Sequence, residues 1–290
     1  MATIAVAGAT GYAGRYLVHR AHDRGHRVIA CVRDEVKTRI PGKAGAPSIS
    51  HIADDIRVAD FTDRAACATA VAGADIVISA VGRAGGDGWA IDFGANVNLL
   101  AAAGQAGATR FVYINSLNAT PGAVGGLAAK AAFVHASQLS PVDTVIASPS
   151  GFFSDMAGVL RQAAGETVFL PPDPDIRLNP VHGADLADTL LDAAESEIAP
   201  EPFTVGGPDI FTYGQILDMA ITSLGTDPTI VRVPDFGDKG RDVVAAVAGD
   251  RAPMWLKMME TYLSRDAIGE PHGTHHLKDF FDDQRGAFHE

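Results

Sequence analysis

The chain has 290 residues, of which 47% are hydrophobic and 20% charged, as in ordinary folded proteins and unlike disordered or fibrous ones. With a formal net charge of -12 it lacks the clustered Lys and Arg that a nucleic-acid backbone requires, so nucleic acid is excluded as the main partner. No apolar run reaches the roughly 18 residues of a membrane span, and no signal-peptide pattern opens the chain, so we expect a cytoplasmic protein that does not bind membranes.

Short apolar runs alternate with segments of helical periodicity through the first half of the chain. The runs cover residues 3–7, 27–32, 56–59, 75–81, 110–115 and 144–148, and helical segments cover residues 12–24, 63–72 and 92–106. Runs that are apolar on both faces are typical of a parallel sheet covered by helices. Gly25, Gly73 and Gly107 each follow a helical segment, where a glycine closes a helix with little strain. Residues 1–150 are therefore predicted to form a Rossmann-type, doubly wound α/β core.

The pattern changes after about residue 150. A proline-rich segment covers residues 169–180, and a helix capped by Asp185 is expected next. Strands are predicted at residues 203–205 and 229–233, and helices at residues 213–224 and 252–264. We find no linker, so residues 151–290 are predicted to form a small C-terminal α/β cap, packed on the core as one integrated domain beside a substrate cleft.

Neither the cysteines nor the clustered histidines predict a metal site. Cys31 and Cys67 lie in apolar segments and are expected to be buried, reduced thiols. His272, His275 and His276 stand together in "PHGTHH", but no acidic or sulfur ligand lies at a fixed helical spacing from them. A solvated loop is the favoured interpretation there.

The segment "IAVAGATGYAGRYLV", residues 4–18, carries the main functional motif. Gly8, Gly11 and Gly14 lie between an apolar strand and a helix, with Thr10 and Tyr12 among them. In this setting the first glycine allows a tight turn, the second lets a diphosphate approach the backbone, and the third permits close packing of helix on strand. The motif and its context predict a dinucleotide-binding site in which the three glycines, Thr10 and Tyr12 contact the cofactor.

The residues at the end of the second predicted strand indicate whether the dinucleotide is NAD or NADP. In "VIACVRDE" the strand ends with Arg33, which can pair with the 2′-phosphate of NADP, and Asp34 follows, which would suit the ribose of NAD. The arginine favours NADP (NADPH), and NAD stays possible. Further along, Asp60 and Phe61 are expected to flank the adenine, and Ala80, Val81 and Gly82 to lie beneath the cofactor.

The glycine spacing, followed in order by "VIACVRD", "SAVG" and "FVYINSL", resembles the atypical short-chain dehydrogenase/reductases, specifically their NmrA-like NAD(P)-binding group. The resemblance continues through "AKAAFVHASQLSPVDTVIASPSGFF", "LNPVHGADLADTLLDAA" and "FTVGGPDIFTYGQILDMA", and so spans nearly the whole chain. It implies an NAD(P)-dependent oxidoreductase, although the group also includes proteins that bind the dinucleotide without turning it over. The cofactor contacts implied after the later strands are Asn115, Lys130, Pro149, Ser150, Gly151 and Phe152.

The same resemblance identifies the candidate catalytic residues and one departure. Typical members of the wider family use a tyrosine as general acid, a lysine four residues later and a serine after the preceding strand. Ser116 and Lys130 match the serine and the lysine, but Gly126 stands where the tyrosine is expected. Lys130 is therefore a candidate either for proton donation or only for binding the nicotinamide ribose, and a solvated helix residue is the third interpretation. Tyr113, inside a strand, is expected to be buried.

Aromatic side chains on the predicted loops suggest an apolar substrate pocket. Trp89 and Phe93 follow the fourth strand on a glycine-rich loop, Phe153 and Met156 follow the sixth, and Trp255 lies on the late helix. The expected function is NADP-dependent reduction of a small hydrophobic carbonyl, enone or quinone. The alternative, prompted by Gly126, is a non-catalytic NAD(P)-binding sensor or regulatory protein. A monomer and a homodimer both stay open.

Overall fold

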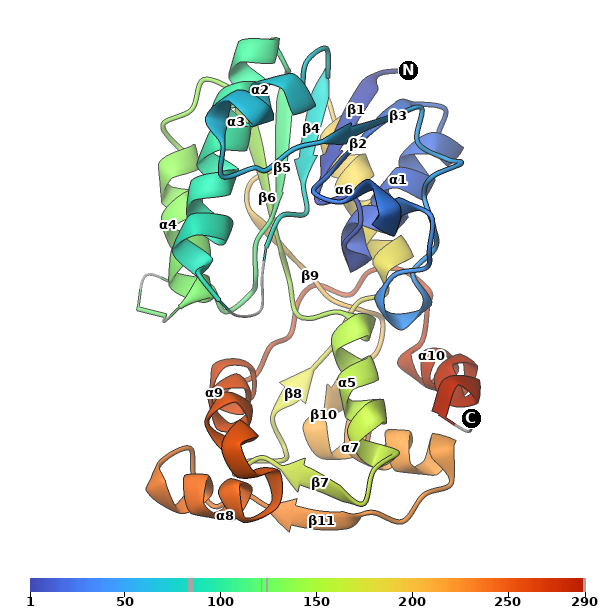
Figure 1. Ribbon diagram of the computed structural model, residues 1–290, viewed down its shortest axis with the longest axis vertical. Helices are drawn as coiled ribbons and strands as arrows, with labels where there is room; N and C mark the ends of the chain where they lie inside the picture. Colours follow the sequence, from blue (N-terminus) through green and yellow to red (C-terminus); the bar gives the residue numbers. More distant parts are fainter. Residues whose placement is uncertain (83–85, 121, 124, 289–290) are drawn as a thin grey trace. The chain divides into compact units, whose positions relative to one another are not determined.

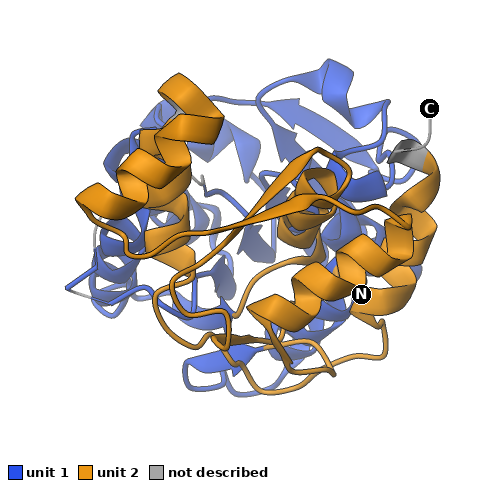
Figure 2. Cartoon of the chain, turned by 90° about the horizontal axis from the view of Figure 1, so that it is seen from below, with its two compact units in different colours: residues 1–149, 183–205 blue, residues 150–182, 206–290 orange. Residues whose placement is uncertain are grey.

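The computed structural model describes residues 1–82, 86–120, 122–123 and 125–288, which form two compact units (Figure 2). Unit 1 consists of Met1–Pro149 and Gly183–Val205, and unit 2 of Ser150–His182 and Gly206–Glu290. The boundary expected at residue 150 is where the chain first enters unit 2. Gly183–Val205, which we expected in the cap region, instead belongs to unit 1. That the two units act as one integrated domain stays a prediction.

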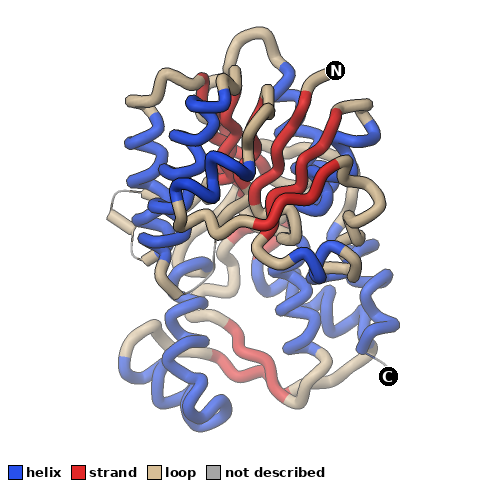
Figure 3. The backbone as a smooth tube through the Cα atoms, turned by 45° about the horizontal axis from the view of Figure 1, so that its top comes forward, coloured by secondary structure: helices blue, strands red, loops and turns tan. Residues whose placement is uncertain are grey.

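The core of unit 1 is a parallel sheet of seven strands in the order β3-β2-β1-β4-β5-β6-β9. This order confirms the predicted Rossmann-type, doubly wound fold, and the strand order reverses between β1 and β4, where such folds bind ligands. Figure 3 shows strands of this sheet in red beside the blue helices that cover it. The three-residue strand β9, Phe203–Val205, pairs with β6 and completes the sheet. The other strands are β1 (Thr3–Ala7), β2 (Arg27–Val32), β3 (Asp55–Val58), β4 (Ile76–Ser79), β5 (Arg110–Ile114) and β6 (Asp143–Pro149).

Helices cover both faces of this sheet (Figure 1). Helices α1 (Tyr12–Asp23) and α6 (Gly183–Glu195) pack together, and α2 (Arg64–Ala70), α3 (Asn96–Ala106) and α4 (Gly126–Ser137) form a row on the other face. Ion pairs join α1 and α6, because Asp188 of α6 lies 2.6 Å from Arg20 and 3.1 Å from Arg24 of α1. Helix α6 begins two residues before the expected start, so Asp185 lies in its first turn and not at its cap.

The segment after β4 differs from the prediction of a flexible loop followed by one helix from Asp92. Trp89–Ala95 forms a π-helical segment, η3, which continues directly into α3. Trp89 and Phe93 therefore lie on a helix, with their rings edge to face at 5.8 Å between centroids. Residues 83–85 of the predicted loop lie outside the described residues. A π-helical turn widens the helix locally and is frequent at functional sites.

Unit 2 combines helices with two small sheets. Helices α5 (Phe153–Ala163), α7 (Tyr213–Leu224) and α10 (Leu277–Gln284) pack on one another, and α8 (Asp238–Ala248) packs on α9 (Ala252–Tyr262). Strand β7 (Thr167–Leu170) pairs in parallel with β11 (Thr229–Arg232), and β8 (Arg177–Leu178) pairs antiparallel with β10 (Phe211–Thr212). This arrangement agrees with the small α/β cap expected from the sequence. None of the helices among the described residues is long and apolar enough to cross a membrane.

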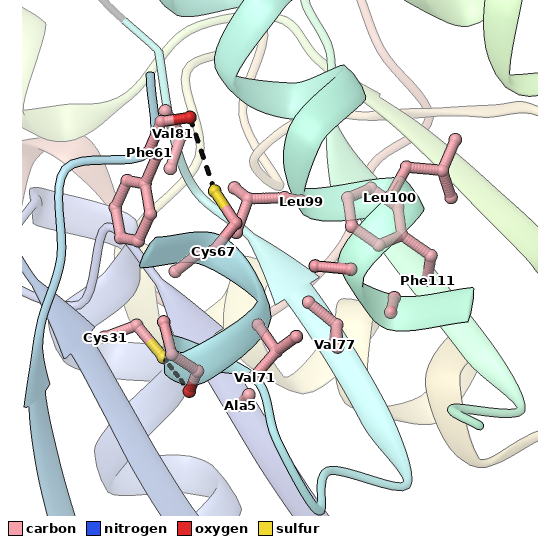
Figure 4. Close-up of a cluster of buried hydrophobic side chains, with 14 of the residues drawn as sticks. Ala5, Cys31, Phe61, Cys67, Val71, Val77, Val81, Leu99, Leu100 and Phe111 are labelled. Carbon is pink, nitrogen blue, oxygen red and sulfur yellow. Dashed lines mark hydrogen bonds between the residues drawn. The ribbon is translucent and has the colours of Figure 1, made fainter. Parts of the chain in front are cut away.

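Both cysteines lie in the apolar layer between the sheet and the helix row of unit 1 (Figure 4). The Cys31 thiol donates to the carbonyl oxygen of Ala70 at 3.2 Å, and the Cys67 thiol donates to that of Phe61 at 3.3 Å. Burial disfavours the thiolate and raises the pKa of Cys31 to about 12 and that of Cys67 to about 11. The expectation of two buried, unpaired thiols is confirmed.

These thiols should resist modification in the folded protein, since the thiolate is the reactive form. We expect a disulfide reagent to label them at least about 100-fold more slowly in the native protein than in denaturant, where an ordinary thiol pKa returns. The release of the chromophoric leaving group measures both rates. Rapid labelling of two thiols without denaturant would contradict this burial.

Candidate functional site

The turn between β1 and α1 depends on two glycines for different reasons. Gly8 has φ +79°, and a Cβ there would lie 2.9 Å from the carbonyl oxygen of Ala80, at the end of β4. A Cβ on Gly14 would lie 2.3 Å from the carbonyl oxygen of Gly8. Gly11 is the N-cap of α1, with no side-chain cap and no acidic residue in the first turn. The positive end of the helix dipole therefore meets no carboxylate from its own first turn.

A cavity of about 600 Å³ opens in unit 1 beside this turn. Residues that follow β1, β2, β3 and β4 line it, which places it at the carboxyl edge of the sheet near the reversal of strand order. Nine of the residues predicted to bind the cofactor line this cavity, and their contact with a cofactor stays a prediction. These nine are Gly8, Thr10, Gly11, Arg33, Asp60, Phe61, Ala80, Val81 and Gly82.

The rest of the cavity wall was not predicted. Most of it comes from the connection between β2 and β3, which lacks the periodicity that reveals a regular element. Lys37 and Lys43 were visible as cations near Arg33, but no pattern placed them on the same wall. The unpredicted lining residues are Arg15, Lys37, Ile40, Pro41, Gly42, Lys43, Thr62, Ile91 and Ala95.

The cavity carries positive charge in an acidic protein. Among the residues that the structure describes, four cationic side chains line it, and Asp60 is the only carboxylate that does so. Asp60 accepts hydrogen bonds from the amide and hydroxyl of Thr62, and these bonds, together with the nearby charge of Arg33, lower its pKa. Asp34 does not line the cavity. Its carboxylate accepts from the amide of Val36 at 3.0 Å and so caps the short helix η1 (Glu35–Thr38).

Lys130 is a partly enclosed side chain of α4, with 14% of its surface exposed, and not a solvated helix residue. Its ammonium nitrogen lies 3.2 Å from Oδ1 of the buried Asp92, and it donates to the carbonyl oxygen of Ile114 at 3.1 Å and to the hydroxyl of Tyr113 at 3.4 Å. Burial lowers the pKa of Lys130, and Asp92 partly opposes this shift. Helix α4 begins at Gly126, so Lys130 lies one turn inside it.

Lys130 and Asp92 lie directly behind the cavity wall at Gly82. A Cβ on Gly82 would come within 3.0 Å of both the Lys130 Nζ and the Asp92 Oδ1. The side-chain amide of the buried Asn96 holds this region together, because it donates to the carbonyl oxygens of Val81 at 3.2 Å and Asp92 at 3.0 Å. Gly82 therefore joins the cavity wall to Lys130 and Asp92.

No tyrosine takes the position of the missing general acid in this cluster. Tyr113 is completely buried, as expected, and donates its hydroxyl to the carbonyl oxygen of Asp92 at 3.3 Å. Burial and the nearby Asp92 hold its pKa well above the usual range. Gly126 has a different role, because a Cβ on Gly88 would lie 2.6 Å from the Gly126 Cα. The first turn of α4 thus packs backbone to backbone against the start of η3.

The remaining predicted cofactor contacts do not line the cavity. Tyr12 is buried and its hydroxyl accepts from the amide of Gly183, the first residue of α6. Asn115 follows β5 and donates to the hydroxyl of Ser148 at 3.0 Å, while its Oδ1 is buried with no partner among the described residues. Ser116 is half-buried just after it. Gly14 packs beneath the turn, and Pro149 ends β6.

The other predicted contacts and pocket residues belong to unit 2. Ser150 donates its hydroxyl to the carbonyl oxygen of Asn179 at 2.6 Å. Gly151 has φ +147° and Phe152 precedes α5. Phe153 is 1% exposed and packs against Phe280 and His182, as a core residue does. Met156 and Trp255 are half-buried, and the Trp255 ring lies 6.2 Å from that of Phe169. That these residues and the pair formed by Trp89 and Phe93 bind a substrate stays a prediction.

A parallel sheet with a glycine turn after its first strand and a cation-lined cavity at the reversal of strand order defines a dinucleotide-binding Rossmann protein. Residues 8–197 match the NAD(P)H-binding family, and the chain belongs to this family. The predicted resemblance to atypical short-chain dehydrogenase/reductases is confirmed at this level.

Two curated relatives are similar over most of the chain. A chloroplastic divinyl chlorophyllide a 8-vinyl-reductase of Zea mays is 29% identical over 252 residues, which are 80% of this chain and 62% of the maize protein. The chain thus spans less than two thirds of that relative. The 40 kDa subunit of mitochondrial NADH-ubiquinone oxidoreductase from Neurospora crassa is 25% identical over 280 residues, 91% of this chain and 70% of the subunit.

Solved structures share the fold at low sequence identity. An NADPH-dependent quinone oxidoreductase from Escherichia coli, complexed with NADPH, has a TM-score of 0.71 at 16% identity, over 99% of this chain and 100% of that one. A nucleoside-diphosphate-sugar epimerase from Staphylococcus aureus has a TM-score of 0.72 at 14% identity, over 97% and 100% of the two chains. At these identities the likeness establishes the fold alone.

Gly14→Ala should destabilise the protein, because the added methyl group meets the Gly8 carbonyl oxygen, which belongs to the backbone and cannot rotate away. We expect a loss of about 1–3 kcal/mol in the free energy of unfolding, measured by chemical denaturation. Gly158→Ala is the matched control within a helix, since nothing lies within 4 Å of its added Cβ, and it should be neutral or stabilising. Equal stability of the two variants would contradict the close approach at Gly14.

Proposed function

We propose that the protein is an NADP-dependent oxidoreductase that reduces a small hydrophobic carbonyl, enone or quinone-type compound. The observation that carries the proposal is the positive cavity beside the glycine turn, in a chain whose formal charge is -12. Clustered cations in an acidic protein attract an anionic ligand to that place alone. A dinucleotide with an additional phosphate is the anion that suits this cavity at this edge of a Rossmann sheet.

The environment of Arg33 and Asp34 supports NADP over NAD. An NAD site needs a carboxylate free to accept the ribose hydroxyls at the end of the second strand. Asp34 caps η1 and lies 4.0 Å from the ammonium of Lys37, whereas Arg33 lines the cavity. Arg33, Lys37 and Lys43 would surround the 2′-phosphate, and a guanidinium can hold it by two parallel hydrogen bonds.

The names of relatives support the substrate class. The relative from Zea mays is a vinyl reductase, and one of the solved structures of the same fold is a quinone oxidoreductase. The first name specifies reduction of a vinyl group, and the second specifies a quinone as the substrate. The exposed Trp89 and its neighbour Phe93 offer apolar surface on η3, the segment that also contains Asp92.

In this proposal, different residues of the chain bind the cofactor, donate the proton and orient the substrate. Bound NADPH supplies a hydride. The backbone of the Gly8–Gly11 turn and the first turn of α1 hold the diphosphate. Lys130, kept charged by Asp92 despite its burial, holds the nicotinamide ribose and provides the proton at its ammonium, and Ser116 orients the substrate oxygen. A lowered lysine pKa brings this acid closer to neutral pH and makes it more effective.

The alternative is a protein that binds NADP(H) and reports on it without turnover. Two observations favour it: Gly126 supplies no proton donor, and the Lys130 ammonium already has three acceptors around it. The two functions differ in one measurable property, which is the oxidation of NADPH in the presence of an acceptor.

The cofactor preference can be measured by titrating the protein with NADPH and NADH and following nicotinamide fluorescence. We expect tighter binding of NADPH, and a loss of about 10–100-fold in its affinity in Arg33→Ala, because a charge-assisted hydrogen bond to the phosphate disappears. NADH binding should change little. Arg39→Ala is the control, since Arg39 is exposed, pairs with Glu35 and does not line the cavity. Equal affinities of the wild-type protein for both cofactors would contradict the preference.

Turnover should be tested by following NADPH absorbance with a panel of cyclic enones, aromatic ketones and quinones. We expect oxidation by the wild-type protein and a fall in kcat of about 10²–10⁴-fold in Lys130→Met, as for loss of a general acid. Lys278→Met, on the exposed side of α10, is the control. Intact NADPH binding without any oxidation would favour the sensor.

The pH dependence of kcat separates proton donation from ribose binding. A donor must be protonated, so the rate falls as pH rises through the lysine pKa, which burial lowers from its ordinary 10.5. Asp92→Asn removes the opposing attraction, and the alkaline fall should then move to lower pH. An unchanged profile in this variant would restrict Lys130 to binding.

A further inference from the structure

The guanidinium of Arg15, the residue that directly follows the third glycine of the turn, is a buried charge in unit 1. Arg15 is 2% exposed. Its Nε donates to the carbonyl oxygen of Thr10 at 3.0 Å, its Nη1 to those of Ile40 and Pro47, both at 2.8 Å, and its Nη2 to that of Lys37 at 2.5 Å. Four of the five N–H groups of the guanidinium are thus used on backbone carbonyls.

These acceptors join two separate parts of the cavity wall. Thr10 belongs to the glycine turn, whereas Lys37, Ile40 and Pro47 belong to the connection between β2 and β3. The backbone of Gly42 packs against the same guanidinium, because a Cβ there would lie 2.4 Å from the Arg15 Nε. Arg15 therefore binds the connection at several points, from Lys37 within η1 to Pro47. His19 of α1 adds a contact with the carbonyl oxygen of Ser48 at 2.8 Å.

That path places the two lysines on the cavity wall. The Lys37 carbonyl is bound directly by Arg15, and Lys43 follows Gly42 in a tight turn in which Ala44 has φ +53°. A non-glycine residue in this conformation is strained and needs the surrounding structure to hold it. Both side chains are exposed, so the course of the backbone beneath them directs them toward the same wall as Arg33, and the Lys37 ammonium also lies 4.0 Å from Asp34.

The charge of Arg15 is also left uncompensated. Within the part of the chain that the structure describes, no carboxylate forms an ion pair with it, and the carbonyl groups supply dipoles without a negative charge. Because guanidinium stays protonated even when buried, a fixed positive charge borders the cavity.

We propose that Arg15 is the positioning residue for the 2′-phosphate end of the cofactor: by binding the β2–β3 connection to the glycine turn, it places Lys37 and Lys43 beside Arg33. The preference for NADPH then depends on a side chain whose hydrogen bonds go to the protein and not to the phosphate. The proposal rests on the NADP preference proposed above and adds what builds the phosphate site.

Two variants test the proposal from opposite sides of the contact. Arg15→Lys keeps a positive charge but cannot reach four carbonyls, and Gly42→Ala leaves Arg15 in place but pushes a methyl group against its guanidinium. Each should weaken NADPH binding by about tenfold, the equivalent of one lost phosphate contact, with a change of less than about threefold for NADH. Arg39→Lys is the matched control in the same connection, on an exposed side chain that pairs with Glu35.

A second measurement reports on the connection itself. Trypsin cleaves after Lys37, Arg39 and Lys43, and the cleavage rate at these sites should rise in Arg15→Lys and Gly42→Ala but not in Arg39→Lys, which keeps the same number of sites. Adenosine 2′,5′-bisphosphate should slow this cleavage more than adenosine 5′-monophosphate does. The circular dichroism spectrum and melting temperature confirm that each variant is folded.

The outcomes separate this proposal from the proposed function. If the wild-type protein prefers NADPH and both variants lose affinity for NADPH and NADH equally, or lose none, Arg15 has no role in reading the phosphate. If the wild-type protein binds both cofactors equally, the NADP preference fails, and the role of Arg15 in specificity fails with it. A selective loss for NADPH together with faster cleavage supports the proposal.

Discussion

Gly14 has no side chain, and for this reason the first turn of α1 can approach the carbonyl oxygen of Gly8 at the end of β1. Everything at the carboxyl edge of the sheet depends on this backbone contact. The N-terminus of α1 lies beside the cavity, Gly8 lies against the end of β4, and Arg15, in the same first turn of α1, binds the β2–β3 connection. A Cβ at either glycine would separate these elements, since the atoms it meets belong to the backbone.

Two largely buried cationic side chains of unit 1, Lys130 and Arg15, have different electrostatic surroundings. Lys130 faces a carboxylate, so its charge is balanced within the protein, and burial acts on it through its pKa. Arg15 faces only carbonyl dipoles, so its charge is held without being neutralised. A balanced charge suits a group that exchanges a proton, whereas an unbalanced one suits the permanent recognition of an anion.

Local patterns predicted the sheet and the glycine turn well, because strand periodicity and glycine spacing act over a few residues. Three features could not be predicted from the sequence, each for a physical reason. Three of the carbonyl groups that bind Arg15 belong to the β2–β3 connection, more than 20 residues further along the chain. The sequence of that connection has no periodicity from which its path could be predicted. The π-helical course of Trp89–Ala95 depends on the fit of Gly88 against Gly126 and on the buried amide of Asn96. The return of Gly183–Val205 to unit 1 is a matter of tertiary pairing, which helical or strand propensity does not encode.

That return has a consequence for how the protein is made. When Pro149 leaves the ribosome, β6 is still an open sheet edge, and the α6 carboxylates that pair with Arg20 and Arg24 have not emerged. Unit 1 can close only after the first stretch of unit 2 has emerged and Val205 has followed it. An exposed sheet edge can pair with strands of other chains and so promote aggregation. The nascent protein has this exposed edge until β9 is added, whereas a Rossmann domain formed from one continuous segment does not wait for a distant strand. A fragment that ends at residue 150 would keep the exposed edge permanently.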